Sequence, residues 1–144
     1  MNFFAYGSLI FEEVMYAVTG RRFEHCDAIL VGYSRYQVRN ASYPGLIQQI
    51  NGRIEGVLYK DLDTLSWRQL DRFEGEYYAR TAVHVMIDWE ETTEAETYVF
   101  RETHRSLLSD EPTAPGSGDT SIKVKELLAN LKASQGEVLN PALD

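Results

Sequence analysis

The chain has 144 residues, 44% hydrophobic and 25% charged, which is the composition of one soluble globular domain and excludes a disordered chain. Its net charge of −8 is opposite to the clustered Lys and Arg of a nucleic-acid surface, so we expect a small-molecule partner and no nucleic acid. Cys26 is the only cysteine, and no Cys and His spacing is typical of a zinc site, so we expect neither a disulfide nor a metal.

The start of the sequence lacks a leader pattern, with neither a basic nor an apolar signal region. No apolar run approaches the ~20 residues that cross a bilayer. We therefore expect a cytoplasmic protein without a membrane partner.

The first predicted elements are a strand and a helix. Residues 2–6 form a predicted buried strand, and residues 9–18 carry five apolar side chains at helical spacing. These are Leu9, Ile10, Val14, Met15 and Val18. Gly20 follows as a natural helix end. The chain therefore turns directly from a strand into a helix through Gly7 and Ser8.

Extended segments follow between residues 23 and 62. Residues 23–39 are predicted as two extended pieces hinged near Gly32, followed by a turn at Pro44-Gly45. Asn51-Gly52 is a typical hairpin turn, and the runs on either side of it are predicted to pair as antiparallel strands. These runs are residues 46–50 and 53–62.

The second half of the chain begins with a short helix. Asp63 or Thr64 can cap a helix over residues 64–74, and Gly75 ends it. Two predicted strands follow, the first with alternating faces. They are residues 77–88 and 96–101.

A loop over residues 109–120 and a last helix close the sequence. The apolar stripe of this helix is typical of a helix that covers a barrel, with a partner-binding helix as the alternative. The stripe consists of Val124, Leu127, Leu128 and Leu131.

Strands outnumber helices in this pattern, and hairpins join several of the strands. We therefore predict an α+β fold, a small mixed and mainly antiparallel β-barrel with two or three flanking helices, in a single domain over residues 1–144. A doubly wound fold is disfavoured because residues 23–60 carry strands without intervening helices.

The turn at Tyr6-Gly7-Ser8-Leu9 is a candidate anion site. A strand that turns into a helix leaves the first backbone N–H groups of the helix unpaired, where they attract an anion such as a carboxylate. Gly7 allows a close approach to the backbone, and Ser8 can cap the helix or donate its hydroxyl. An ordinary tight turn is the alternative, and the spacing is not that of a phosphate loop.

Glu74 is a candidate proton acceptor. It lies in the last turn of the helix predicted to end at Gly75, where the macrodipole disfavours a carboxylate, and such local misfits are typical of functional sites. An apolar wall would raise its pKa and make it a better base near neutrality. A solvated surface glutamate is the alternative, and Glu55 and Glu76 are competing acids.

Five stretches together resemble the gamma-glutamylcyclotransferase-like family, also called the AIG2-like family. The resemblance spans roughly residues 2 to 101 and implies a compact barrel with a site that needs neither a metal nor a cofactor. It also implies that the site is formed by the YGSL turn and Glu74. The stretches are FAYGSL (4–9), YPGL (43–46), GVLYKDL (56–62), LDRFEGEYYAR (70–80) and TYVFR (97–101).

The reaction that the resemblance implies is an intramolecular cyclisation. The α-amino group of a gamma-glutamyl compound attacks its own γ-carbonyl, which forms 5-oxoproline and releases an amine. Glu74 would take a proton from the α-ammonium group and return it to the leaving nitrogen as a single general acid/base. The N–H groups of Gly7, Ser8 and Leu9 would bind the α-carboxylate or the oxyanion, with Tyr6 in the pocket wall.

Three further residues are weaker candidates for substrate binding. Tyr78 and Arg80 match a Y-x-R segment of the family and would offer a hydroxyl and a positive charge, with exposed strand residues as the alternative. Tyr43 lies in the YPG loop, where a plain turn is the alternative.

The chain departs from the family pattern after residue 101, and a tryptophan that often accompanies the closing helix is missing. The leaving amine therefore stays open among gamma-glutamyl amino acids, gamma-glutamyl-ε-lysine, glutathione and gamma-glutamyl intermediates. The alternative to an enzyme is a non-catalytic gamma-glutamyl binding or interaction module on the same fold. The sequence does not define an oligomeric state.

Overall fold

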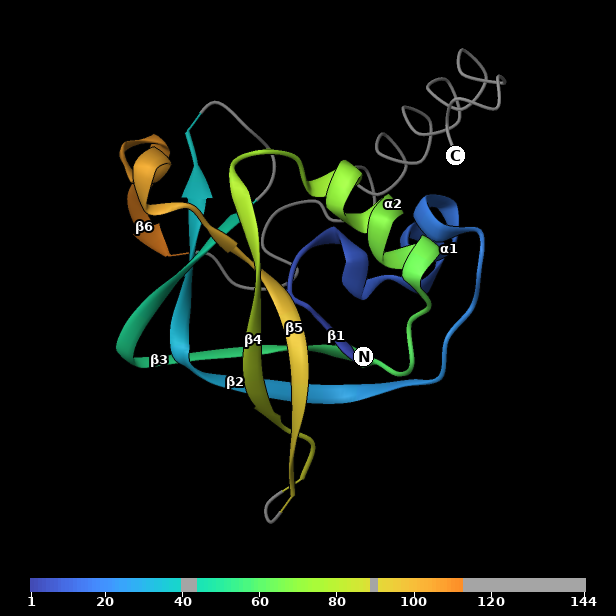
Figure 1. Cartoon of the computed structure of the whole chain (residues 1–144). Helices are drawn as coiled ribbons and strands as arrows, with labels where there is room; N and C mark the ends of the chain where they lie inside the picture. The colour runs from blue at the N-terminus through green and yellow to red at the C-terminus, as the bar shows by residue number, and fades with distance from the viewer. Residues whose placement is uncertain (40–43, 89–90, 113–144) are drawn as a thin grey trace.

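Strands form a closed barrel in the computed structural model, which describes residues 1–39, 44–88 and 91–112 (Figure 1). In the described chain, the order around the barrel is β3-β1-β5-β4-β2, and β2 pairs with β3 to close it. The pair β1–β5 is parallel and the other pairs are antiparallel, so the predicted mixed, mainly antiparallel barrel is confirmed. The strands are β1 (Phe3–Ala5), β2 (His25–Val38), β3 (Pro44–Tyr59), β4 (Tyr78–Met86) and β5 (Thr92–Phe100).

Two helices, α1 (Glu12–Thr19) and α2 (Thr64–Glu74), lie side by side against the barrel (Figure 1). Asp63 caps α2 by accepting a hydrogen bond from the N–H of Ser66, and Gly75 ends the helix with φ +82°, as the sequence predicts. No helix in residues 1–39, 44–88 and 91–112 is long and apolar enough to span a bilayer.

The predicted helix over residues 9–18 starts later than expected. A 3-10 helical turn, η1 (Ser8–Ile10), comes first, and α1 begins only at Glu12. The end is as predicted, because Gly20 takes the left-handed conformation with φ +74°. The strand and the helix are therefore separated by a short tight turn with its own hydrogen bonds.

The apolar core has two parts. One fills the barrel with side chains that include Phe4, Leu30 and Val85, and the other lies between the barrel and the helices. The second part includes Phe3, which stacks on Tyr59 and meets Trp67 edge to face. Successive residues of β1 therefore face different halves of the core, and this fixes the register of the strand that precedes the turn.

The hairpin predicted at Asn51-Gly52 is wrong. These residues lie inside the continuous strand β3, at an irregularity where the pairing with β2 passes from Val31 opposite Arg53 to Tyr33 opposite Gln48. Gly52 is needed for close approach rather than for a turn, because an added Cβ would overlap the carbonyl of Tyr33. The long hairpin is instead formed by β2 and β3.

A predicted turn and a predicted hinge also lie within strands. Pro44-Gly45 begins β3 rather than forming a turn, and Gly45 packs against Leu108 and Phe100. Gly32 is a bulge with φ +92° inside β2, so the two predicted pieces form one strand.

The region after β5 also differs from the prediction. A 3-10 helix, η2 (Glu102–Leu107), is followed by β6 (Leu108–Pro112), which pairs antiparallel with the end of β2 at Tyr36 and Val38. Residues 109–112 are therefore strand rather than loop. Residues 113–120 and the predicted stripe of Val124 to Leu131 lie outside the described residues.

Gly56→Ala is expected to loosen β1 from the barrel. A Cβ at this position would overlap the carbonyl oxygen of Ala5 and lie 2.7 Å from the ring of Phe4. We expect the free energy of unfolding, measured by urea titration, to fall by about 2–3 kcal/mol. Gly20→Ala is the control, because it has a positive φ with nothing within 4 Å and should cost only about 1 kcal/mol. Equal losses in the two variants would contradict the proposed crowding at β1.

Candidate active site

The turn after β1 is anchored at both ends. The hydroxyl of the buried Tyr6 donates to the carbonyl of Tyr98 at 2.5 Å, and the guanidinium of Arg35 donates to the carbonyl of Tyr6. The hydroxyl of Tyr59 donates to the carbonyl of Leu9 at 2.6 Å. Side chains from β2, β3 and the backbone of β5 therefore hold the turn in place.

The turn presents backbone donors. The N–H groups of Ile10 and Phe11 bond to the carbonyls of Gly7 and Ser8, at 3.1 and 3.2 Å. The three preceding N–H groups, of Gly7, Ser8 and Leu9, have no hydrogen-bond acceptor among the described residues. A Cβ on Gly7 would lie 3.5 Å from the Pro44 side chain, so the turn faces the start of β3.

Glu74, the last residue of α2, is half-buried. Burial raises its pKa from 4.5 to about 8. Burial also raises the pKa of Tyr6 well above its ordinary value, and the charge of Glu74 adds to this increase. The Glu74 carboxyl is therefore within electrostatic range of the Tyr6 hydroxyl.

Tyr98 connects the turn to α2. Its carbonyl accepts the hydrogen bond from Tyr6, and its own hydroxyl donates to Asp71 Oδ1 at 2.7 Å. Burial raises the pKa of Tyr98, with further increases from Asp71 and Glu74. Since Asp71 is one helical turn before Glu74, this contact fixes the end of α2 that carries the carboxyl.

Arg80 reinforces the same contact from β4. Its Nη1 lies 3.5 Å from Asp71 Oδ2, its Nε lies 2.9 Å from Glu96 Oε2, and its guanidinium lies 4.7 Å above the ring of Trp67. No interaction between described residues joins Arg80 to the turn. The structure thus places Arg80 against Trp67 and Asp71 of α2.

The structure brings most of the predicted site residues together. Tyr6, Gly7, Ser8 and Leu9 form one turn, and the Tyr6 hydroxyl is in electrostatic range of Glu74. Tyr78 is buried at the start of β4 and donates its hydroxyl to the carbonyl of Pro44 at 2.6 Å. Tyr43 lies outside the described residues, and the competing acids Glu55 and Glu76 are exposed.

Sequence reasoning did not assign Arg35 or Asp71 to the site. The helical period could have identified Asp71, because this residue precedes Glu74 by three positions and lies on the same face of the helix. Arg35 is 5% exposed inside the barrel. Only the bulge at Gly32 determines which way that side chain points.

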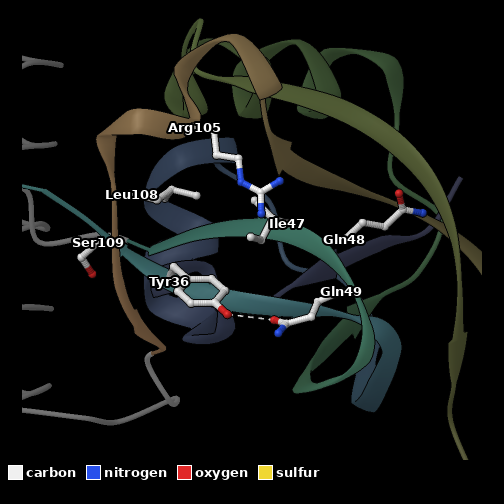
Figure 2. Close-up of a pocket in the computed structure, with 7 residues that line it drawn as sticks. All are labelled: Tyr36, Ile47, Gln48, Gln49, Arg105, Leu108 and Ser109. Atoms are coloured by element: carbon white, nitrogen blue, oxygen red, sulfur yellow. Dashed lines mark hydrogen bonds between the residues drawn. The ribbon is translucent and has the colours of Figure 1, made fainter.

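A separate cavity of about 300 Å³ lies on the side of β2 and β3 that η2 and β6 cover (Figure 2). Figure 2 shows Arg105 extended over Ile47, and Tyr36 hydrogen-bonded to Gln49 at 2.9 Å. The remaining lining residues are Gln48, Leu108 and Ser109. No predicted site residue that the structure describes lines this cavity, so it is distinct from the group around Tyr6 and Glu74.

The turn and Glu74 together combine a proton-transfer group with anion donors. A carboxyl with a pKa of about 8 exchanges a proton near neutral pH. The N–H groups of the turn can stabilise a carboxylate or a developing oxyanion. Within the described ranges, no three His, Cys, Asp or Glu side chains gather to hold a metal ion.

Comparison with known proteins identifies the family. The protein-family model described as "Gamma-glutamyl cyclotransferase, AIG2-like" matches residues 3–118. The chain belongs to this family. The match extends beyond residue 101, where the resemblance in the sequence was expected to end.

The chain is similar to a curated plant protein and to solved structures. It is 32% identical over 119 residues to AIG2-like protein C of Arabidopsis thaliana, covering 82% of this chain but only 66% of that protein. A solution structure from Arabidopsis thaliana superposes with a TM-score of 0.65 at 21% identity, covering 97% of this chain and 93% of that one. A solved gamma-glutamyl cyclotransferase superposes with a TM-score of 0.65 at 14% identity, covering 90% and 98%. These superpositions confirm the fold.

Glu74→Gln is expected to change how stability depends on pH. The carboxyl has a pKa of about 8 in the folded protein and about 4.5 when solvated, so between these values folding takes up a proton. The stability of the wild type therefore falls as the pH rises through this window, whereas the glutamine variant lacks this loss. At pH 8.5 we expect the variant to be more stable by about 1–3 kcal/mol, and at pH 5 about equal.

Thermal and urea unfolding at both pH values measure this difference. Glu76→Gln is the matched control, because Glu76 is exposed two residues further along the chain. The same difference between Glu74→Gln and the wild type at pH 5 and pH 8.5 would contradict a raised pKa.

Proposed function

We propose that this chain is a metal-independent enzyme of the gamma-glutamylcyclotransferase type. It converts a gamma-glutamyl amide into 5-oxoproline and a free amine, with Glu74 as the general acid/base. The observation that carries the proposal is the half-buried Glu74 carboxyl, with its pKa raised to about 8, in electrostatic range of the turn residue Tyr6. Membership of a family that includes gamma-glutamyl cyclotransferases supports it.

The proton steps fit a single carboxyl. Ionised Glu74 takes a proton from the substrate α-ammonium, and the neutral amine then attacks the γ-carbonyl, which closes the five-membered ring. Collapse of the tetrahedral intermediate breaks the bond to the leaving nitrogen, and Glu74 returns the first proton to that nitrogen. The second proton lost by the ring nitrogen passes through the regenerated Glu74 carboxylate to the released amine, which leaves as an ammonium ion. A raised pKa suits both steps, because the carboxylate is a stronger base and the acid still gives up its proton near neutrality.

The protein's other contribution is geometric. The attacking and attacked groups already belong to one substrate molecule, so the site needs to hold a bent conformer and stabilise the oxyanion. In this proposal the N–H groups of Gly7, Ser8 and Leu9 bind the α-carboxylate or the oxyanion. Tyr6 forms part of the pocket wall, and Tyr43 is assigned there by its place in the family pattern.

Tyr78 and Arg80 support the site in different ways. The hydrogen bond from Tyr78 to the Pro44 carbonyl holds the start of β3 next to Gly7, so the ring of Tyr78 belongs to the same wall. Arg80 is bonded to Asp71 and Glu96, and this supports a role in positioning α2 rather than direct contact with substrate.

Product analysis tests the reaction and its base. We expect 5-oxoproline, detected by mass spectrometry, from at least one of gamma-glutamyl-alanine, gamma-glutamyl-ε-lysine and glutathione. Glu74→Gln is expected to lower the rate about 10²- to 10⁴-fold, the usual contribution of a general acid/base. Glu76→Gln should retain the wild-type rate.

Two results would contradict the assignment. Folded wild type that forms no 5-oxoproline from the panel would favour the non-catalytic binding module. A folded Glu74→Gln variant with the wild-type rate would show that another group is the base. The preferred panel member identifies the leaving amine.

The pH dependence tests the state of Glu74 in the free protein. Since the base must be ionised, kcat/KM is expected to rise with pH, with the midpoint of the rise at the Glu74 pKa of about 8 and a plateau above it. The loss of activity toward acid pH reflects protonation of this carboxyl. A rise centred near 4.5, the ordinary value for glutamate, would contradict the proposed effect of burial.

A further inference from the structure

Arg35 is a buried cation that the proposed reaction has not yet used. Its side chain lies inside the barrel on β2 and is 5% exposed. Its guanidinium donates to the carbonyl of Tyr6, the first residue of the site turn. Burial lowers the pKa of Arg35, yet an arginine keeps its charge at physiological pH.

The charge of Arg35 has no ion-pair partner among the described residues. The ion pairs of the described chain join other cations to acids, including Arg80 to Asp71 and Arg22 to Glu12. A guanidinium held out of water without a counter-charge is unfavourable, so an anion that arrives next to it is favoured.

The hydrogen bond to Tyr6 directs this charge toward the turn. The peptide bond between Tyr6 and Gly7 is trans, so its carbonyl and its N–H point in opposite directions. Arg35 occupies the carbonyl side, which leaves the Gly7 N–H directed away from the guanidinium. A charge-assisted hydrogen bond to a carbonyl polarises the peptide and strengthens its N–H as a donor.

The Tyr6 phenol lies within the electrostatic range of both Arg35 and Glu74. The positive charge and the carboxyl therefore both act on the side chain of Tyr6. An anionic group bound at the Gly7 N–H would balance Arg35 through the peptide and leave Glu74 free for proton transfer.

We infer that Arg35 is the positioning residue that makes the site select ligands with a free α-carboxylate, by fixing and polarising the Tyr6-Gly7 peptide. This inference rests on the proposed function, because it assigns the charged group of a gamma-glutamyl ligand to the turn. It also explains why a cation is buried beside a backbone carbonyl rather than beside an acidic side chain.

The test compares two probes with the full-length chain. The first is 5-oxoproline, which carries the carboxylate, and the second is 5-oxoprolinamide, which is neutral and of similar shape. Titrations followed by amide resonances give both dissociation constants. Because hydrogen bonds to charged groups are strong, we expect the wild type to prefer 5-oxoproline by about tenfold or more.

Variants of Arg35 separate charge from structure. In folded Arg35→Gln the preference is expected to fall to about twofold or less, whereas Arg35→Lys keeps the buried charge and should retain most of it. Arg53→Gln is the matched control, because it removes the same charge from an exposed position on β3 and should leave the preference unchanged. A purely structural role of Arg35 would alter stability but not the preference between the probes.

The outcomes distinguish this inference from the proposed function. Suppose that the wild type forms 5-oxoproline from a gamma-glutamyl compound. The role of Arg35 is then overturned, while the enzyme assignment stands, if folded Arg35→Gln keeps the full preference for 5-oxoproline over 5-oxoprolinamide. The same holds if the wild type shows no preference between these two probes. If the wild type neither turns over gamma-glutamyl compounds nor binds 5-oxoproline, both are overturned.

The inference stays testable if Arg35→Gln fails to fold. In the wild type, the Gly7 amide resonance is expected to shift strongly with 5-oxoproline and weakly with the neutral amide. Equal shifts with the two probes would overturn the proposed path from Arg35 through the Tyr6-Gly7 peptide.

Discussion

The candidate site depends on the short strand β1, which lies between β3 and β5 in the barrel. Only Phe3–Ala5 belong to this strand, yet it pairs antiparallel with β3 and parallel with β5 and so joins these two strands. Tyr6 follows at once, and its hydroxyl bonds to the Tyr98 carbonyl on β5. Since the Tyr98 hydroxyl holds Asp71 of α2, the strand pairing fixes the turn and the carboxyl-bearing helix end together.

The electrostatics of the site follow from how much water the fold excludes. Glu74 has no described ion-pair partner and takes a pKa near 8, which leaves it mainly neutral at pH 7. Arg35 keeps its charge and directs it at the backbone of the turn. The resting site therefore carries positive character at the turn and an exchangeable proton at α2, a combination suited to an anionic ligand that also bears an ammonium group.

The sequence predicted the local features of the site better than the register of the strands. The turn at Gly7-Ser8 and the helix from its Asp63 cap to Gly75 follow from backbone chemistry that acts within a few residues. The hairpin predicted at Asn51-Gly52 is absent, because this pair, typical of a hairpin turn, here lies against the backbone of β2. Arg35 was missed because a bulge in β2 changes the direction of its side chain. If the side chains of β2 alternated strictly from the buried Ala28 and Leu30, Arg35 would point outward. The bulge at Gly32 shifts the alternation by one residue, so that Arg35 points inward.

The position of β1 has a consequence for how the chain folds. Tyr6 and the Tyr98 carbonyl that holds it are 92 residues apart in sequence, and the parallel pairing of Phe3 with Glu96 is comparably distant. Contacts of such long range form slowly, because a large loop must close before they stabilise anything. At a synthesis rate of about 5–20 residues per second, β5 is made several seconds after β1, so β1 can pair with β5 only after this delay. The geometry of the candidate site is thus assembled only after β5 pairs with β1, and its appearance marks completion of the barrel.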